Sequence, residues 1–259
     1  VAIGMPASMR HQRQGDDDWV FDDPRHPYVR RPRATASPDA PAGPPPSFVL
    51  LILESHRALN CGHLVPHGAI ASATPVLDDL AARGRFWTRF SAGGLPTINA
   101  LLATHLGIVQ HPTRSISYDL TTLSSESFTT TLGRHGYRTE FFSAADPAWD
   151  NQGPWLRQWY QGTHYDRSRE SDGAMLSHLA QWMRENLSAA TPFCVTAMSA
   201  TNHYPFNRIP GVQPLPRSAS LQERMIATMR YTDQALGELL DAIRHEAWFD
   251  RTVFVIMGD

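Results

Sequence analysis

The fold is decided by the stretch Phe48-Val-Leu-Leu-Ile-Leu-Glu54-Ser55. Its apolar run from Phe48 to Leu53 shows no polar alternation, which is typical of a strand buried on both faces of a parallel sheet. An acid, Glu54, follows the run directly. Because ligands of open parallel sheets bind beyond the carboxyl ends of the strands, Glu54 stands where a functional side chain is expected.

The rest of the chain after this strand alternates short apolar runs with helical patterns. That alternation predicts βαβ units, and hence an α/β fold with a mostly parallel sheet sandwiched by helices. Further strands are predicted at Arg138–Phe142, at Phe193–Met198 and in the run that starts at Thr252. Helices are predicted at 75–83, 97–105, 127–135, 172–187 and 221–245.

Local signals mark the ends of two of these helices. Thr74 precedes Pro75 and predicts an N-cap followed by proline at the first helical position, and Gly84 ends the same helix. The pair Ser220 and Glu223 has the spacing of a capping box, which predicts the start of the last and longest helix.

Two regions differ in composition. Residues 1–47 hold 9 of the 20 prolines and predict an extended linker or arm, whereas residues 48–259 form the globular domain. The chain starts with Val1 and stops at Asp259, directly after an apolar run that reads as a buried strand. A central strand needs neighbours on both sides, so we expect a fragment whose domain is truncated at its C-terminus.

The composition excludes several classes of protein. With 23 Lys+Arg against 25 Asp+Glu, the chain has no basic excess for binding nucleic acid. All 23 basic residues are Arg, so chemistry that needs a lysine ammonium, such as a phosphate-binding loop or a Schiff base, is absent. The apolar runs are far shorter than the roughly 20 residues that cross a bilayer.

The cysteines exclude two further classes. Cys61 and Cys194 are the only two, and neither belongs to a Cys-x-x-Cys pair. A disulfide scaffold and a structural zinc finger are therefore both excluded, while pairing between the two cysteines stays open.

Three polar side chains follow predicted strands and are therefore candidates for a metal site. Glu54 follows the first strand, His203 lies shortly after the strand that ends near Met198, and Asp259 follows the last. Carboxylate oxygens suit Mn²⁺ or Mg²⁺, and Zn²⁺ is admissible when a histidine joins them. The alternative is that each is an ordinary polar residue at a strand end.

A hydroxyl is predicted beside this metal site. Thr97 follows the turn Gly93-Gly94 and is predicted at the N-terminus of a helix, where backbone N–H groups and the helix dipole favour negative charge. A metal ion would lower the pKa of that hydroxyl further and make it a nucleophile. The alternative is that Thr97 only caps the helix.

Six motifs, in this order and spacing over residues 48–259, together resemble the sulfatase-like catalytic domain of the lipoteichoic acid synthase family, in the alkaline phosphatase superfamily. They are Leu51-Ile-Leu-Glu54-Ser55, Thr74-Pro-Val-Leu-Asp-Asp-Leu-Ala-Ala-Arg-Gly84, Pro96-Thr97-Ile-Asn-Ala-Leu-Leu102, Asn202-His203-Tyr-Pro-Phe206, Tyr231-Thr-Asp-Gln-Ala-Leu-Gly237 and Val255-Ile-Met-Gly-Asp259.

The resemblance implies a role for each candidate residue. Glu54 and Asp259 are implied to bind the metal, and Thr97 to be both a metal ligand and the nucleophile that forms a phospho-threonine. His203 is implied to contact the substrate phosphate or assist proton transfer, and Trp149 to line the substrate pocket. The family has an Arg where this sequence has Asn151, a departure that counts against polyglycerol phosphate as the substrate.

The implied activity is transfer or hydrolysis of a phosphodiester headgroup, of the phosphoglycerol or phosphoethanolamine type, on a lipid or glycan. The implied location is the extracytoplasmic face of a bacterial membrane, with anchoring segments outside this chain. A further metal-binding His of the family lies beyond Asp259, so little activity is expected of residues 1–259 alone.

Two alternatives remain. A sulfatase or another ester hydrolase shares the fold, but the sulfatase nucleophile derives from Cys or Ser in a Cys/Ser-x-Pro-x-Arg context. Neither Cys61 nor Cys194 has that context, and Thr97 cannot be converted to formylglycine. Phosphorus chemistry is therefore favoured. The other alternative is a binding domain that keeps the fold without catalysis.

Overall fold

The computed structural model describes residues 19–20, 31–32, 43–62, 73–111, 113–119, 121–122, 124–207, 209, 215–216 and 218–259. The chain divides into two compact units, residues 1–44 and 45–259. In the first unit, β1 (Trp19–Val20) pairs antiparallel with β2 (Arg31–Pro32). The assignment of residues 1–47 as a linker falls largely outside the described residues and stays a prediction.

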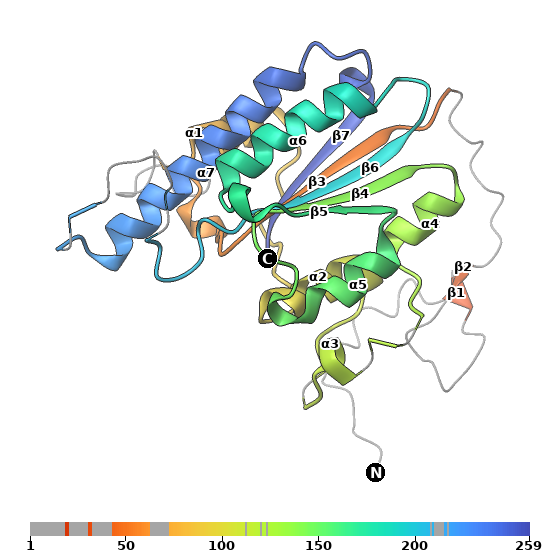
Figure 1. Cartoon of the computed structure of the whole chain (residues 1–259), viewed down its shortest axis with the longest axis horizontal. Helices are drawn as coiled ribbons and strands as arrows, with labels where there is room; N and C mark the ends of the chain where they lie inside the picture. Colours follow the sequence, from red (N-terminus) through yellow and green to blue (C-terminus); the bar gives the residue numbers. More distant parts are fainter. Residues whose placement is uncertain are drawn as a thin grey trace. The chain divides into compact units, whose positions relative to one another are not determined.

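The second unit is built on a parallel sheet of five strands in the order β5-β4-β6-β3-β7 (Figure 1). This confirms the predicted fold class. The strands are β3 (Ser47–Leu53), β4 (Arg138–Ser143), β5 (Gly162–His164), β6 (Phe193–Met198) and β7 (Thr252–Gly258).

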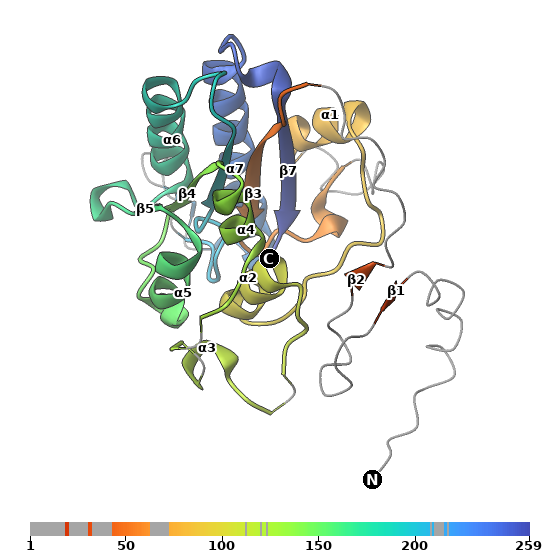
Figure 2. The same ribbon diagram turned by 90° about the vertical axis from the view of Figure 1, so that its right-hand side faces the viewer.

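Helices cover both faces of this sheet. The helices of this unit are η2 (Ala58–Asn60), α1 (Pro75–Arg83), α2 (Thr97–Leu106), α3 (Ile116–Asp119), α4 (Phe128–Arg134), η3 (Trp149–Asn151), α5 (Gln152–Trp159), η4 (Arg167–Arg169), α6 (Asp172–Asn186), α7 (Leu221–Ile243) and η5 (Phe249–Arg251). Figure 1 shows α6 and α7 on one side of the sheet and α2 and α5 on the other. In Figure 2, α5 and α6 lie toward the β5 side and α1 toward the β7 side.

The continuous apolar run of β3 is explained by these two layers. Val49 and Leu51 belong to the core that the sheet forms with α6 and α7. Leu50 and Ile52 point to the other face and belong to the core formed with α2 and α5. Because successive side chains of a strand alternate between faces, a strand covered on both sides directs apolar side chains toward both layers of helices.

The last strand differs from the prediction. The run from Thr252 is a strand, as predicted, but β7 lies at the edge of the described sheet, and Val253 and Val255 are 45% and 39% exposed. An apolar run rich in β-branched residues predicts a strand, but its place in the sheet depends on contacts with distant segments. The short β5 and the helix α5, whose Gly153-Pro154 resembles a turn, had no strong local signal.

The cap of α1 also differs from the prediction. The helix begins at Pro75 after Thr74, but the Thr74 hydroxyl makes no capping bond. Instead, the buried carboxylate of Asp233 in α7 accepts the N–H groups of Val76 at 2.9 Å and Leu77 at 3.0 Å. A residue 157 positions away in the sequence thus satisfies the helix N-terminus, which no local pattern can reveal.

Both cysteines are buried, and no disulfide joins them. Burial raises the pKa of Cys194 to about 12, which keeps it a thiol at neutral pH. Among the described residues, no helix combines the length and the apolar character that crossing a membrane requires.

Candidate functional site

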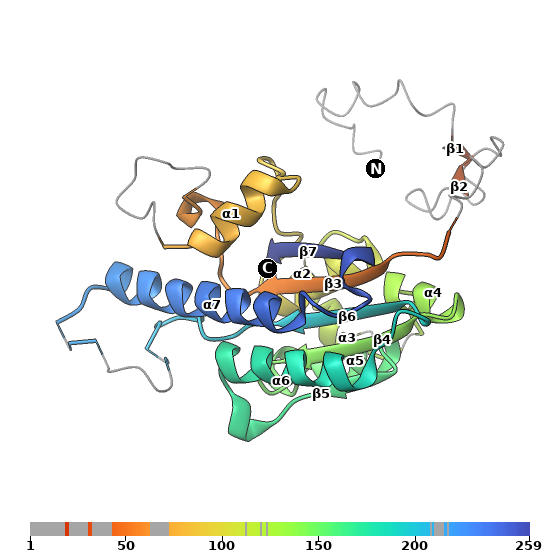
Figure 3. The ribbon, with the colours of Figure 1, turned by 90° about the horizontal axis from the view of Figure 1, so that it is seen from above.

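Three oxygen-bearing side chains meet at the carboxyl ends of the strands. Strands β3 and β7 are parallel neighbours with Leu53 opposite Gly258, so Glu54 and Asp259, the next residue of each strand, lie side by side. Thr97 Oγ1 lies 2.7 Å from Asp259 Oδ2 and 3.2 Å from Glu54 Oε2. Figure 3 shows the strands running in one direction, with the C-terminus at their carboxyl ends.

Thr97 is the first residue of α2 rather than its cap. The capping position is Pro96, and no side chain caps the helix there. The alternative that Thr97 merely caps a helix is therefore wrong, because its hydroxyl is directed to the two carboxylates. The N-terminus of α2 and its dipole favour negative charge at this point, both on the hydroxyl oxygen and on a bound phosphate.

Ser55 organises the two carboxylates, a role that the sequence reasoning missed. The Ser55 N–H donates to Asp259 Oδ1 at 2.8 Å, and the Ser55 hydroxyl donates to Glu54 Oε1 at 2.8 Å. Each carboxylate thus has one oxygen held by Ser55 and the other facing Thr97. The backbone of Ser55 is left-handed, with φ of 52°, and no sequence signal marks that conformation in a serine.

The electrostatics of this site favour a cation. Burial and the negative charge of Asp259 raise the pKa of Glu54 to about 7, against smaller opposing effects of the Ser55 hydroxyl and His203. Two carboxylates with no positive partner between them repel each other, so the pair gains from a proton or a metal ion.

The donor set fits a hard divalent cation. Glu54, Thr97 and Asp259 present carboxylate and hydroxyl oxygens, the ligand type that Mn²⁺ and Mg²⁺ prefer. Within the part of the chain that the structure describes, no group of three His, Cys, Asp or Glu side chains lies close enough to hold a metal. The candidate metal ligands among the described residues are two carboxylates and one hydroxyl.

His203 lies in the connection after β6, exposed to solvent. Its charge lowers the pKa of Glu54, so it lies within electrostatic range of the carboxylate pair. Its Nδ1 is 2.7 Å from the carbonyl oxygen of Tyr204. Because a carbonyl only accepts, Nδ1 carries the ring proton, and Nε2 is the nitrogen left to exchange a proton with a ligand.

Trp149 and Asn151 lie in η3, which follows β4 and packs against α2 and α3. Trp149 is 72% exposed, as a side chain that contacts a substrate must be before binding. Asn151 instead uses its amide within the fold, donating to the carbonyl of Ser117 at 2.7 Å. Among the described residues, no hydrogen bond joins either side chain to Thr97, so their predicted roles in substrate binding stay predictions.

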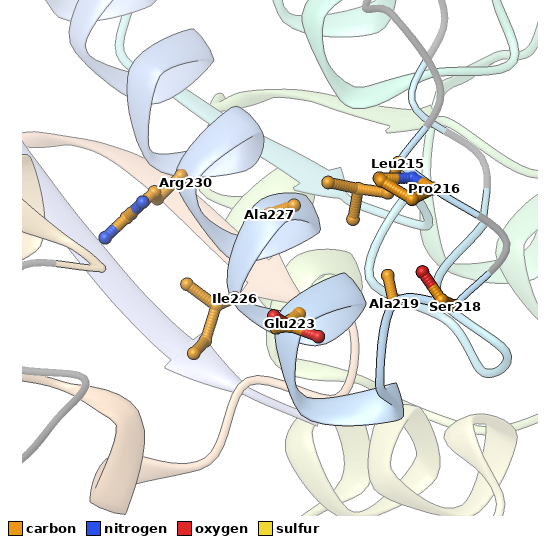
Figure 4. A pocket seen from close by; sticks show the side chains of 8 residues that line it. All are labelled: Leu215, Pro216, Ser218, Ala219, Glu223, Ile226, Ala227 and Arg230. Carbon is orange, nitrogen blue, oxygen red and sulfur yellow. The ribbon is translucent and has the colours of Figure 1, made fainter.

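A separate pocket of about 450 Å³ lies along the first turns of α7 (Figure 4). Its lining comes from the loop residues Leu215, Pro216, Ser218 and Ala219 and from α7, including Glu223 and Arg230. None of Glu54, Thr97 or Asp259 takes part in it, so it is distinct from the site described above.

The family model of sulfatases matches residues 46–259 of the chain. Two curated relatives are the lipoteichoic acid synthase-like YvgJ of Bacillus subtilis (strain 168) and the lipoteichoic acid synthase of Staphylococcus saprophyticus. The first is 29% identical over 84 residues, 31% of this chain and 14% of that protein. The second is 24% identical over 144 residues, 52% of this chain and 21% of that protein. The chain thus spans a small part of these relatives.

Solved structures share the fold. An alkaline phosphatase superfamily protein from Vibrio parahaemolyticus has a TM-score of 0.69 and 20% identity, covering 83% of this chain and 54% of that one. The lipoteichoic acid synthase LtaP from Listeria monocytogenes has a TM-score of 0.67 and 19% identity, covering 82% and 55%. The periplasmic domain of EcEptC from Escherichia coli, in complex with Zn, has a TM-score of 0.59 and 16% identity, covering 83% and 63%.

Proposed function

The chain belongs to the sulfatase family, and we propose that it is a divalent-metal-dependent transferase or hydrolase acting on phosphodiester headgroups through a phospho-threonine intermediate at Thr97. The observation that carries this proposal is the position of the Thr97 hydroxyl, at the N-terminus of α2 and within 3.2 Å of both carboxylates. A hydroxyl placed there is favoured as a nucleophile, because negative charge on its oxygen is stabilised by the helix dipole.

In the first step, Thr97 Oγ1 attacks the phosphorus of the diester. The bond from phosphorus to one alcohol oxygen breaks, and the phosphoryl group with its remaining ester stays on Thr97. The proton of the Thr97 hydroxyl passes to a carboxylate, and Asp259 Oδ2 at 2.7 Å is the nearest acceptor. The departing alcohol takes up a proton from His203, a role that we assign to this residue because it is exposed to solvent and close enough to act electrostatically on Glu54.

In the second step, an alcohol or water attacks the same phosphorus, and the bond to Thr97 Oγ1 breaks. An acceptor alcohol completes a transfer, whereas water completes a hydrolysis. The proton held by Asp259 returns to Oγ1, and the attacking group gives its proton to His203, so each group ends in its starting state. Thr97 Oγ1 therefore accepts the phosphoryl group and later releases it from the same position beside the two carboxylates.

Glu54, Thr97 and Asp259 would hold the metal, with Mn²⁺ or Mg²⁺ favoured by their oxygens and Zn²⁺ admissible with a histidine. When bound, such an ion supplies Lewis acidity that lowers the pKa of a hydroxyl and offsets negative charge on phosphoryl oxygens. The chain's own part is to keep two carboxylate oxygens directed at one hydroxyl.

The proposed substrate is a lipid or glycan phosphodiester at the extracytoplasmic face of a bacterial membrane. The names of the lipoteichoic acid synthase relatives support this substrate class. We expect the exposed Trp149 to contact an organic headgroup with its aromatic face.

The experiment is intact-mass analysis of the protein at its native length after incubation with Mn²⁺ and vesicles containing phosphatidylglycerol or phosphatidylethanolamine. We expect a phosphoglycerol or phosphoethanolamine adduct that maps to Thr97, is absent from Thr97→Val and persists in Thr97→Ser. Full turnover by Thr97→Val would contradict the covalent intermediate. Hydrolysis of an aryl sulfate that survives in Thr97→Val would favour the sulfatase alternative.

A binding domain without catalysis is tested by titration calorimetry with Mn²⁺. Undetectable Mn²⁺ binding by the wild-type protein would favour that alternative, because the proposed reaction depends on a divalent cation held by the two carboxylates.

A further inference from the structure

A chain of buried polar side chains lies behind the Glu54–Ser55 turn. Asn202, Thr228 and Ser199 are 1%, 0% and 3% exposed. Polar groups are buried at a cost unless they form hydrogen bonds, so the partners of each indicate what the group is there to hold. The Ser199 hydroxyl accepts the N–H of Glu54 at 2.8 Å, which ties the connection after β6 to the residue after β3.

Asn202 makes the second and more extensive tie. Its Nδ2 donates to the carbonyl oxygen of Glu54 at 3.2 Å and to that of Ser55 at 3.2 Å. Its Oδ1 accepts from the hydroxyl of Thr228 in α7. The amide cannot be turned around, because its oxygen would then face two carbonyl oxygens.

These two carbonyls belong to the turn that orients the carboxylates. Ser55 adopts a left-handed backbone that side chains rarely occupy unless surrounding contacts hold it. In that conformation the Ser55 N–H reaches Asp259 Oδ1 and its hydroxyl reaches Glu54 Oε1. Because Asn202 holds the carbonyl oxygens of both Glu54 and Ser55, the peptide groups of this turn have little freedom to rotate.

We propose that Asn202 is a positioning residue that fixes the Glu54–Ser55 turn, and through it the two carboxylate oxygens that face Thr97. The inference rests on the proposed function for its meaning, because it concerns the same carboxylate pair. It adds a residue that touches neither the hydroxyl nor the substrate, and it extends the site to α7 through Thr228.

Helix α7 supplies a matched control. Thr232 lies one turn after Thr228, is equally buried, and donates to the buried carboxylate of Asp172. Asp172 in turn accepts the N–H groups of Ala200 at 2.7 Å and Thr201 at 3.0 Å. Both threonines therefore hold the connection after β6. Thr228 does so through the side-chain amide of Asn202, which reaches Glu54 and Ser55, whereas Thr232 does so through Asp172.

The test compares Asn202→Ala, Thr228→Val, Thr228→Ser and Thr232→Val by two measurements, each made on the protein at its native length. The first is hydrogen exchange of the Ser55 amide without metal. The second is the Mn²⁺ dissociation constant by calorimetry. If Asn202→Ala does not fold, the valine and serine variants of Thr228 decide the outcome.

We expect Asn202→Ala to speed exchange of the Ser55 amide about tenfold. We expect it to weaken Mn²⁺ binding by about 10- to 100-fold, the usual effect of losing a residue that orients metal ligands. Thr228→Val should change the Ser55 exchange rate and the Mn²⁺ dissociation constant in the same direction as Asn202→Ala. Thr228→Ser should keep both values near those of the wild type. Thr232→Val should leave both within about twofold of the wild type while lowering the melting temperature.

Unchanged Ser55 exchange in Asn202→Ala would overturn the inference, as would equal effects of Thr228→Val and Thr232→Val. If the wild-type protein binds no Mn²⁺, the proposed function fails, and the exchange measurement alone then decides whether Asn202 positions the turn.

Discussion

Two buried glutamates on the same sheet have opposite electrostatic settings. Glu54, 7% exposed after β3, faces Asp259, and burial with that negative charge raises its pKa to about 7. Glu140, 5% exposed in β4, lies 2.8 Å from His164 Nε2 and 2.9 Å from Arg138 Nε. Burial alone would raise the pKa of Glu140, but hydrogen bonds from His164 and Arg138 outweigh it and hold the pKa below its ordinary value.

The difference distinguishes a carboxylate that is paired within the fold from one that we propose binds a metal ion. Glu140 has its counter-charges within the fold and joins β4 to the edge strand β5 through His164. Glu54 has a second carboxylate and a hydroxyl as neighbours, and the charge of His203 offsets only part of the rise in its pKa. Burial is similar in both places, and the neighbours decide the role.

The sharpest test of this contrast is metal affinity in Glu54→Gln and Glu140→Gln. We expect Glu54→Gln to weaken Mn²⁺ binding by about 100-fold or more, because one charged ligand is lost from a set of few. Glu140→Gln should leave the dissociation constant within about twofold. Titration calorimetry measures both, and equal losses would show that the two carboxylates do not differ in role.

A loss of stability is expected when Glu140 loses its charge. Glu140→Gln should lower the free energy of unfolding by about 2 kcal/mol at pH 7, because a buried group loses charged partners. Since folding lowers the pKa of Glu140, its contribution is full above the ordinary value of 4.5 and is lost as the pH falls through the folded-state pKa. Urea denaturation of the wild-type protein and of Glu140→Gln should show that their difference in the free energy of unfolding shrinks from pH 7 to pH 3. A difference that grows as the pH falls would refute this.

The packing around Glu140 is tested at Gly162 in β5. A Cβ at this position would lie 1.9 Å from Glu140 Oε2, so Gly162→Ala must displace the carboxylate from its partners. We expect a loss of about 1–3 kcal/mol in the free energy of unfolding. Gly133→Ala in α4 is the control, because its nearest neighbouring atom is 3.9 Å away, and it should be neutral or stabilising by up to about 1 kcal/mol. Thermal denaturation that ranks the two variants equally would contradict the close contact.

The smallest effect is expected where a carboxylate pairs on the surface. Arg83 and Asp79 form an ion pair one turn apart on α1, with side chains 69% and 59% exposed. Arg83→Ala should change the free energy of unfolding by no more than about 0.5 kcal/mol, because water screens the pair. A loss as large as that of Glu140→Gln would show that burial does not set the scale of these interactions.

Part of the site could be predicted because it depends on strand ends. Glu54 and Asp259 follow apolar runs in the sequence, and parallel strands place their carboxyl ends together. The contacts of Ser55 and Asn202 could not be predicted from the sequence. Those of Ser55 depend on a left-handed backbone, and those of Asn202 are made to backbone carbonyl oxygens, which no side-chain pattern reveals. Asn202 appeared only as part of a motif, without a role.

The sequence by itself determined the alternation of strands and helices, the residues that follow each strand and the absence of lysine, because these depend on local hydrophobic pattern and composition. The tertiary structure alone decided that β7 lies beside β3 and that Thr97 meets Asp259 across 162 positions. It also decided which oxygen of each carboxylate faces the hydroxyl. The physical reason is that such contacts join segments far apart in the chain, and only packing of the whole sheet against its helices selects one partner for each group.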